Sequence, residues 1–323
     1  MSFNWQRRWL PLLIPLAVLL AWLGLALIPH LAGGVPLGDY AHSGVLIQAE
    51  ELKDLIAKPD PNLRIIDVRH KAKYYLGHIP GAIQMWRPEL EDRRQPTPGV
   101  PAPAAQIEKL LGRLGVGSHD NIVIYSDQCD QARLWWILAH YGFPLSQMRL
   151  LDGGLVAWKA KGYPTQLTSP RFKSATFRFP AEAPKNFLWA NLAEVKAAQA
   201  APDKVILDGR TPRFYLGERT REGAARSGRI PGAVGIPWEE NRIAAGPYKA
   251  YWKSAAELKK LYADRGVTPD KDIYIYCHSN VRASYTLVSL YLAGYPLEKL
   301  HLYSGGWIEW SRSKEPVEKG PVK

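Results

Sequence analysis

IYIYCHSNVRAS, residues 273–284, is the stretch that decides the fold of this chain. Four β-prone residues lead directly into Cys277, and after a short polar run the pattern becomes helical, which predicts a strand, a tight loop and a helix start. A thiol at this position would lie beside loop amides and the positive end of the helix, and both favour the thiolate form. Taken alone, the stretch fits a small buried structural cysteine equally well.

The composition narrows the classes of protein that fit. The chain has 323 residues, which is enough for two domains of ordinary size, each with its own core. Its cysteines are Cys129 and Cys277, and no Cys/His cluster accompanies them, so neither a disulfide framework nor a metal site is expected. The net charge of +12 is spread along the chain without a long basic block. We therefore expect no nucleic-acid partner, and small anionic substrates or an anionic membrane surface account for the charge.

Residues 1–35 are predicted to form a membrane anchor or a signal segment. Arg7 and Arg8 precede an apolar run, residues 9–29, that is long enough to cross a hydrocarbon core of roughly 30 Å as a helix. The run is longer than most signal-peptide cores and has no clear cleavage site, which favours an uncleaved transmembrane helix. The arginine pair on its N-terminal side predicts that the remaining chain lies outside the cytoplasm, in the periplasm. The alternative is a cleaved signal and a soluble periplasmic protein.

Four blocks of sequence occur twice in the same order. IIDVR recurs as ILDGR, and GHIPGA recurs as GRIPGA. LGVGSHDNIVIYS, ending at Ser126, recurs as RGVTPDKDIYIYC, ending at Cys277, and LDGGLVAW recurs as LYSGGWIEW. Alternating strand and helix patterns accompany each set. The sequence therefore predicts two copies of one α/β domain, over residues 40–165 and 188–323, joined by an extended linker over 166–187.

The two copies differ at the positions that carry chemistry. Ser126 takes the place of Cys277 in the first copy, so one nucleophile per chain is expected, and nearby Cys129 is interpreted as structural. The second copy has a longer segment between its first two blocks, PRFYLGERTREGAARSGR, which carries five arginines. A solvated basic loop would look the same. Because the arginines are concentrated in the copy that has the cysteine, they favour an anion site.

These motifs, Asp-x-Arg, Gly-x-Ile-Pro-Gly-Ala, the CHSNVR loop and Gly-Gly-Trp-x-x-Trp, resemble those of the rhodanese family, in particular the two-domain thiosulfate and 3-mercaptopyruvate sulfurtransferases. The resemblance extends over residues 45–316. It implies an α/β fold of two tandem rhodanese-like domains, each a parallel sheet flanked by helices, with an inactive first domain. It also implies that Cys277 takes a sulfane sulfur from a small anionic donor as a persulfide and passes it to a thiol or cyanide acceptor, without a metal or organic cofactor.

The resemblance also assigns roles around the cysteine. The loop amides would hold the negative persulfide, and a positive charge at the sixth loop position would add to them. The residues concerned are His278, Asn280, Val281 and Arg282. Ser279 matches a serine of the mercaptopyruvate subgroup, in which that serine and an aspartate of the inactive domain are proposed to relay a proton during C–S cleavage. Asp92 stands at that aspartate's spacing from the GHIPGA block, and the alternative is a surface charge paired with Arg93 or Arg94.

The arginine-rich segment is expected to hold the anionic group of the donor. Arg213 matches the first of two substrate arginines of the mercaptopyruvate subgroup, and Arg221 lies beside the second position, which is Glu222. The CHSNVR loop matches neither the thiosulfate-type nor the mercaptopyruvate-type sequence, so the donor stays open.

Two other functions fit the same features. A non-catalytic sulfur carrier, or a scaffold that docks a membrane partner, would use the same fold. A cysteine phosphatase or arsenate reductase fits less well, because its phosphate cradle is a C-x5-R loop, whereas four residues separate Cys277 from Arg282.

Overall fold

The computed structural model describes residues 39–58, 60–181, 185–244, 246 and 250–321. The predicted anchor or signal segment within residues 1–35 lies outside them and stays a prediction. Among the helices of the described ranges, none is both long and apolar enough to span a bilayer. The chain from Leu37 onward forms one unit, and both sequence repeats lie in it.

The first repeat folds into a five-stranded parallel sheet with the strand order β1-β5-β4-β2-β3. Its strands are β1 Leu46–Ile47, β2 Leu63–Asp67, β3 Ala82–Gln84, β4 Asn121–Tyr125 and β5 Met148–Leu151. The helices beside it are α1 Ala49–Ala57, α2 Lys71–Tyr75, α3 Ala104–Arg113, α4 Asp130–His140 and α5 Gly154–Ala160. The central strand β4 is buried from its second residue onward, as its apolar run predicts for a parallel sheet covered by helices.

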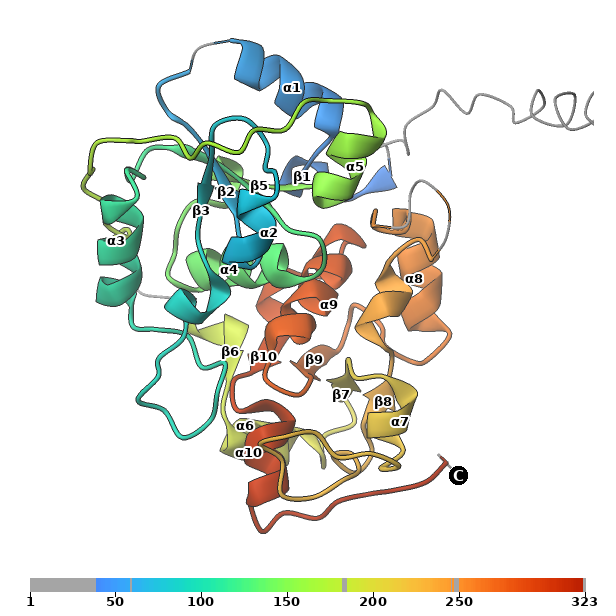
Figure 1. Ribbon diagram of the computed structural model, residues 1–323. Helices are drawn as coiled ribbons and strands as arrows, with labels where there is room; N and C mark the ends of the chain where they lie inside the picture. Colours follow the sequence, from blue (N-terminus) through green and yellow to red (C-terminus); the bar gives the residue numbers. More distant parts are fainter. Residues whose placement is uncertain (1–38, 59, 182–184, 245, 247–249, 322–323) are drawn as a thin grey trace, which may run out of the picture. The chain divides into compact units, whose positions relative to one another are not determined.

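The second repeat has the same topology, with the strand order β6-β10-β9-β7-β8. Its strands are β6 Trp189–Ala190, β7 Lys204–Asp208, β8 Val234–Gly235, β9 Asp272–Tyr276 and β10 Leu300–Tyr303. Its helices are α6 Leu192–Ala198, α7 Pro212–Tyr215, α8 Ala255–Ala263, α9 Val281–Leu292 and α10 Gly306–Arg312. The two sheets match strand for strand along the chain, which confirms the predicted duplication and the α/β fold (Figure 1).

The repeated Asp-x-Arg motif is a structural clamp. In the second domain, the Arg210 guanidinium lies 2.6 Å from the Asp208 carboxylate and donates to the Gly228 carbonyl at 2.7 Å. The first domain has the same clamp at the equivalent residues. Each clamp ties the end of a strand to the start of the Gly-x-Ile-Pro-Gly-Ala block. The chain there needs a glycine, because Gly228 has a φ of +120°.

Helices α4 and α9 pack against each other and join the two domains (Figure 1). A buried carboxylate also crosses this interface. Asp152 accepts a hydrogen bond from the Trp252 backbone amide at 3.0 Å and another from the Gln48 side-chain amide at 3.2 Å. Burial raises the pKa of Asp152 to about 7, although both hydrogen bonds oppose this shift.

Replacing Asp152 by asparagine should therefore remove part of the pH dependence of stability. The folded-state pKa lies above that of an unfolded aspartate, so between about pH 4 and pH 7 the folded chain binds more protons, and the free energy of unfolding falls as pH rises. Asparagine keeps an acceptor for the Trp252 amide and carries no charge. At pH 8 we expect Asp152→Asn to be more stable than wild type by up to about 4 kcal/mol.

Urea unfolding at pH 5 and pH 8 measures this difference. Asp203→Asn is the control, because the Asp203 side chain is exposed and its replacement should leave the pH dependence as in wild type. An Asp152→Asn variant with the wild-type pH dependence would contradict a buried ionisable carboxylate at the interface.

Candidate active site

Cys277 follows β9 at the carboxyl end of the central strand of the second sheet, and α9 begins soon after it, at Val281. The predicted strand, tight loop and helix start are confirmed. The Cys277 side chain is 2 % exposed. Asn280 makes the tight turn, with a φ of 62°, and its side-chain amide donates to the Ser304 carbonyl. Because asparagine tolerates this left-handed conformation better than most residues, we assign Asn280 a structural role.

The first two carbonyls of the loop are hydrogen-bonded to α10. Backbone amides at the start of α10 donate to the carbonyls of Cys277, at 2.8 Å, and His278, at 3.3 Å. Since a trans peptide holds its N–H opposite its carbonyl, the amides of His278 and Ser279 point away from α10. A Cβ at Gly306 would lie 2.8 Å from the His278 carbonyl oxygen, so this close approach requires the second glycine of the Gly-Gly block.

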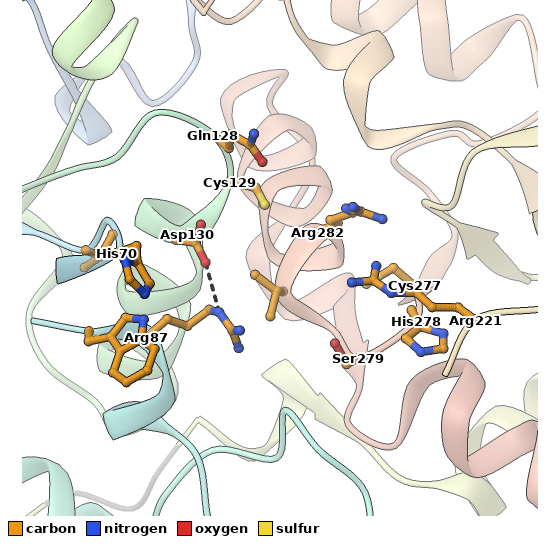
Figure 2. A pocket seen from close by; sticks show the side chains of 13 residues that line it. His70, Arg87, Gln128, Cys129, Asp130, Arg221, Cys277, His278, Ser279 and Arg282 are labelled. Carbon is orange, nitrogen blue, oxygen red and sulfur yellow. Dashed lines mark ion pairs between the residues drawn. The ribbon is translucent and has the colours of Figure 1, made fainter. Parts of the chain in front are cut away.

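A cavity of about 340 Å³ lies in front of the loop, and both domains line it. The second domain contributes Arg221, Cys277, His278, Ser279, Val281 and Arg282. The first domain contributes Val68, His70, Trp86, Arg87, Gln128, Cys129 and Asp130. Figure 2 shows these side chains facing a common space from two sides. The candidate site is therefore built at the domain interface rather than within the second domain.

Positive charge is in excess around Cys277. Arg87 is paired with Asp130 at 3.1 Å and also with Glu91. By contrast, no ion pair among the described residues includes Arg221 or Arg282. Two guanidinium groups without a carboxylate partner favour an anion in the cavity.

His278 connects the catalytic loop to the arginine-rich segment. Its Nε2 donates to the Glu222 carbonyl at 2.8 Å. Burial lowers the pKa of His278 and the charge of Arg221 lowers it further, although the hydrogen bond opposes both, so the imidazole is neutral at neutral pH. Because Arg221 precedes Glu222 in the chain, this hydrogen bond holds the Arg221 backbone beside the cavity.

The structure brings only one of the two predicted substrate arginines to Cys277. Arg221 lines the cavity, but Arg213 does not. The Arg213 side chain is 70 % exposed, and its acidic neighbour is Glu218 at 3.8 Å. The backbone turns back locally here, because the Glu218 amide donates to the Arg213 carbonyl, and this turn leaves the side chain in solvent. Arg226 of the same segment serves the fold, since its guanidinium donates to three carbonyls at the end of α10.

The structure does not bring Asp92 into the cavity with Cys277 and Ser279. The Asp92 carboxylate accepts hydrogen bonds from the backbone and side chain of Arg94, and it borders a different cavity, of about 490 Å³. The Arg94 guanidinium holds the pKa of Asp92 well below its usual range. Asp92 pairs with Arg94, as the alternative role expected, but its side chain is buried rather than on the surface. The Pro-rich segment that follows Asp92 does reach the catalytic loop, because a Cβ at Gly99 would lie 2.3 Å from the Ser279 carbonyl oxygen.

The wall contributed by the first domain was not predicted. Cys129, interpreted from sequence as structural, is buried but lines the same cavity as Cys277. Burial and the neighbouring Asp130 raise the pKa of the Cys129 thiol, so it is a poor nucleophile at neutral pH. The sequence repeat could have predicted that these residues of the first domain lie near the site. The segment after Ser126 is equivalent to the catalytic loop, and both follow the central strand of a sheet.

Comparisons with known proteins match the same two halves of the chain. The rhodanese-like domain family matches residues 48–161 and 191–313. The sulfur carrier protein TtuD of Thermus thermophilus is 32% identical over 298 residues, covering 87% of this chain and 99% of that protein. The thiosulfate sulfurtransferase of Azotobacter vinelandii is 30% identical over 287 residues, with coverages of 87% and 99%. The anaerobic ergothioneine biosynthesis enzyme of Chlorobium limicola, solved with trimethyl histidine, shares the fold with a TM-score of 0.78 at 23% identity, over 89% of this chain and 73% of that one.

Removal of the Arg221 guanidinium should weaken anion binding beside Cys277. Sulfate is expected to protect Cys277 of the wild type from iodoacetamide, as measured by mass spectrometry of its peptide. Arg221→Ala should need about tenfold more sulfate for the same protection, because one charge-assisted contact is worth roughly 1.5 kcal/mol. Arg213→Ala removes an exposed arginine of the same segment and should behave as wild type. Equal protection of wild type and Arg221→Ala would contradict an anion site at Arg221.

Proposed function

The chain belongs to the rhodanese family by both of its domains, and from this membership we propose that it is a sulfurtransferase that carries a sulfane sulfur as a persulfide on Cys277. Relatives over most of the chain are named thiosulfate sulfurtransferase and sulfur carrier protein, which supports sulfur transfer in general. The observation that carries the proposal is the surroundings of Cys277: the loop carbonyls are bonded to α10, and the two unpaired arginines line the cavity.

The first step loads the sulfur. The Cys277 thiolate attacks the outer sulfur of thiosulfate, a new S–S bond forms, and the S–S bond of the donor breaks. Sulfite leaves with the electron pair. The product is a Cys277 persulfide anion, which the amides of His278 and Ser279 and the free N–H groups at the start of α9 can hold. Arg221 and Arg282 hold the charge of the donor and of the leaving sulfite.

The second step unloads the sulfur. A thiolate or cyanide attacks the outer sulfur of the persulfide, and the S–S bond to Cys277 breaks. The electron pair returns to the cysteine as its thiolate, so neither step needs an external oxidant or reductant. The acceptor would approach past Trp86 and Arg87 of the first domain, which form the opposite wall of the cavity.

We favour thiosulfate over 3-mercaptopyruvate as the donor, because the predicted proton donor lies at another cavity. Sulfite leaves without a proton, whereas the enolate released from mercaptopyruvate requires one. Asp92, the aspartate predicted to deliver that proton, is held by Arg94 and borders another cavity. Ser279 lines the cavity with Cys277 but without that carboxylate.

A sulfur carrier is the second candidate, because a relative at 32% identity over nearly its whole length is named as one. A carrier would load one sulfur and release it only to a partner protein, whereas an enzyme would turn over with a small acceptor such as cyanide.

We also propose a location for the protein. An anchor over residues 9–29 would hold both domains in the periplasm.

Cys277→Ser should abolish thiocyanate formation from thiosulfate and cyanide, because Cys277 directly follows the central strand β9 and stands beside the amides of the catalytic loop, where a thiolate is stabilised. Mass spectrometry of donor-treated wild type should show one added sulfur on the peptide that contains Cys277. Cys129→Ser is the matched control and should keep at least about half of the turnover, since its thiol is neutral and buried. Turnover that survives in Cys277→Ser would refute the assignment, and loading without turnover in the wild type would favour the carrier.

The wild type should prefer thiosulfate over 3-mercaptopyruvate by at least about tenfold in kcat/KM, because general acid catalysis contributes typically 10²-fold or more and the cavity lacks the predicted aspartate. Asp92→Asn should change kcat/KM for neither donor. A large loss of mercaptopyruvate turnover in Asp92→Asn would restore the proton relay and reverse the choice of donor.

A further inference from the structure

Arg133 is an unusual charge in the core of the first domain. It lies on α4, and 1 % of its surface is exposed. No ion pair among the described residues includes it. Its Nη2 donates to the Gly99 carbonyl, its Nη1 has no hydrogen-bond partner, and its guanidinium lies over the Trp136 ring at 4.7 Å from the centroid. Burial lowers the pKa of Arg133 to about 10, so the side chain is charged at neutral pH.

An unpaired charge in a core is costly. A buried ion that has lost its partner typically destabilises a protein by several kcal/mol, and a hydrophobic residue of similar volume would be more stable. The single bond to Gly99 and the contact with Trp136 do not replace a carboxylate partner. A role in folding alone therefore does not account for an arginine at this position.

The surroundings of Arg133 connect it to the catalytic loop. Gly99 accepts its hydrogen bond and at the same time packs on Ser279, so closely that a Cβ at Gly99 would lie 2.3 Å from the Ser279 carbonyl oxygen. The φ of Gly99 is +90°, which also requires glycine. The negative charges that oppose the lowered pKa of Arg133 are Glu91 first and Cys277 second. The charges of Arg133 and of a Cys277 thiolate therefore lie close enough to interact.

We propose that Arg133 of the first domain is a positioning residue for sulfur transfer at Cys277. Its hydrogen bond holds Gly99 against Ser279 and so fixes the catalytic loop from the first domain. Its positive charge stabilises the thiolate and the persulfide anion without touching them. This inference rests on the proposed function for its kinetic part only, because the reactivity of the Cys277 thiol can be measured without a sulfur donor.

Several other groups affect the same thiol and must stay unchanged in the test. The charged and titratable groups around the cavity and Arg133 are His70, Arg87, Glu91, Cys129, Asp130 and Tyr141 from the first domain, and Arg210, Arg221, His278 and Arg282 from the second. Substitution of Arg133 leaves all of them in place.

The experiment measures the rate at which iodoacetamide alkylates Cys277 in the full chain from pH 5 to pH 10, read by mass spectrometry of the Cys277 peptide. Arg133→Met should shift the pH midpoint upward by about one unit and lower the rate at pH 7 about tenfold. Arg133→Lys keeps the charge and should keep the midpoint, but it should lower kcat with thiosulfate and cyanide about tenfold, because lysine cannot reproduce the guanidinium contact with Gly99. Arg64→Met, at the amino-terminal end of β2, is the control and should match wild type in both measurements.

The alkylation and turnover measurements distinguish a failure of the role proposed for Arg133 from a failure of the proposed function. An unchanged midpoint in a folded Arg133→Met variant, together with wild-type kcat in Arg133→Lys, would overturn the proposal. If Arg133→Met does not fold, Gly99→Ala takes its place: it should lower kcat about tenfold with an unchanged alkylation midpoint, and a wild-type kcat would overturn the positioning role. A wild type that transfers no sulfur would refute the proposed function, while the alkylation profiles would still test Arg133.

Discussion

The packing of α4 against α9 is the constraint on which the rest of the structure depends. Each helix follows the loop at the carboxyl end of the central strand of its sheet. When the two helices pack together, the two loops are brought to one place, and Cys277 shares a cavity with Cys129 and Asp130. One continuous cluster of buried apolar side chains runs from the first domain into the second, so this contact is part of the core rather than a contact between independent domains. The copy without the nucleophile is thereby an obligatory half of the site.

Charged side chains lie at two places along this same interface. A carboxylate lies at one place and guanidinium groups lie at the other. Asp152 brings a carboxylate to the backbone of the second domain, and burial holds its pKa near 7. Near the catalytic loop, Arg133 and Arg282 bring positive charge without a carboxylate partner among the described residues. Burial of the Arg133 charge costs free energy, and an anion nearby, such as a thiolate or a persulfide, offsets part of that cost. The electrostatics of the interface therefore favour the anionic states of sulfur.

Spacing in the sequence was a poor guide to which side chains meet across the domains. Asp92 and Arg213 both stand at the intervals that the family pattern suggests, yet neither lines the cavity. In each case a contact made within a few residues decides the direction of the side chain: Arg94 holds the Asp92 carboxylate, and a local turn leaves Arg213 in solvent. Local hydrogen bonds form at little cost in chain entropy, so they outcompete longer contacts that the spacing alone would allow.

The sequence by itself determined the duplication, the parallel sheets and the strand, loop and helix around Cys277, because these follow from hydrophobic period, turn residues and repeats that act over short stretches. It also placed His278 and Arg282 near the cysteine, since they lie in the same loop, and it singled out Arg221 through the arginine-rich segment of the cysteine-bearing copy. Only the tertiary structure decided that Gln128, Cys129 and Asp130 form the opposite wall and that Arg133 reaches the loop through Gly99. The contacts between the two domains join residues more than a hundred positions apart, and their pairing is set by how α4 and α9 pack rather than by any pattern within either stretch.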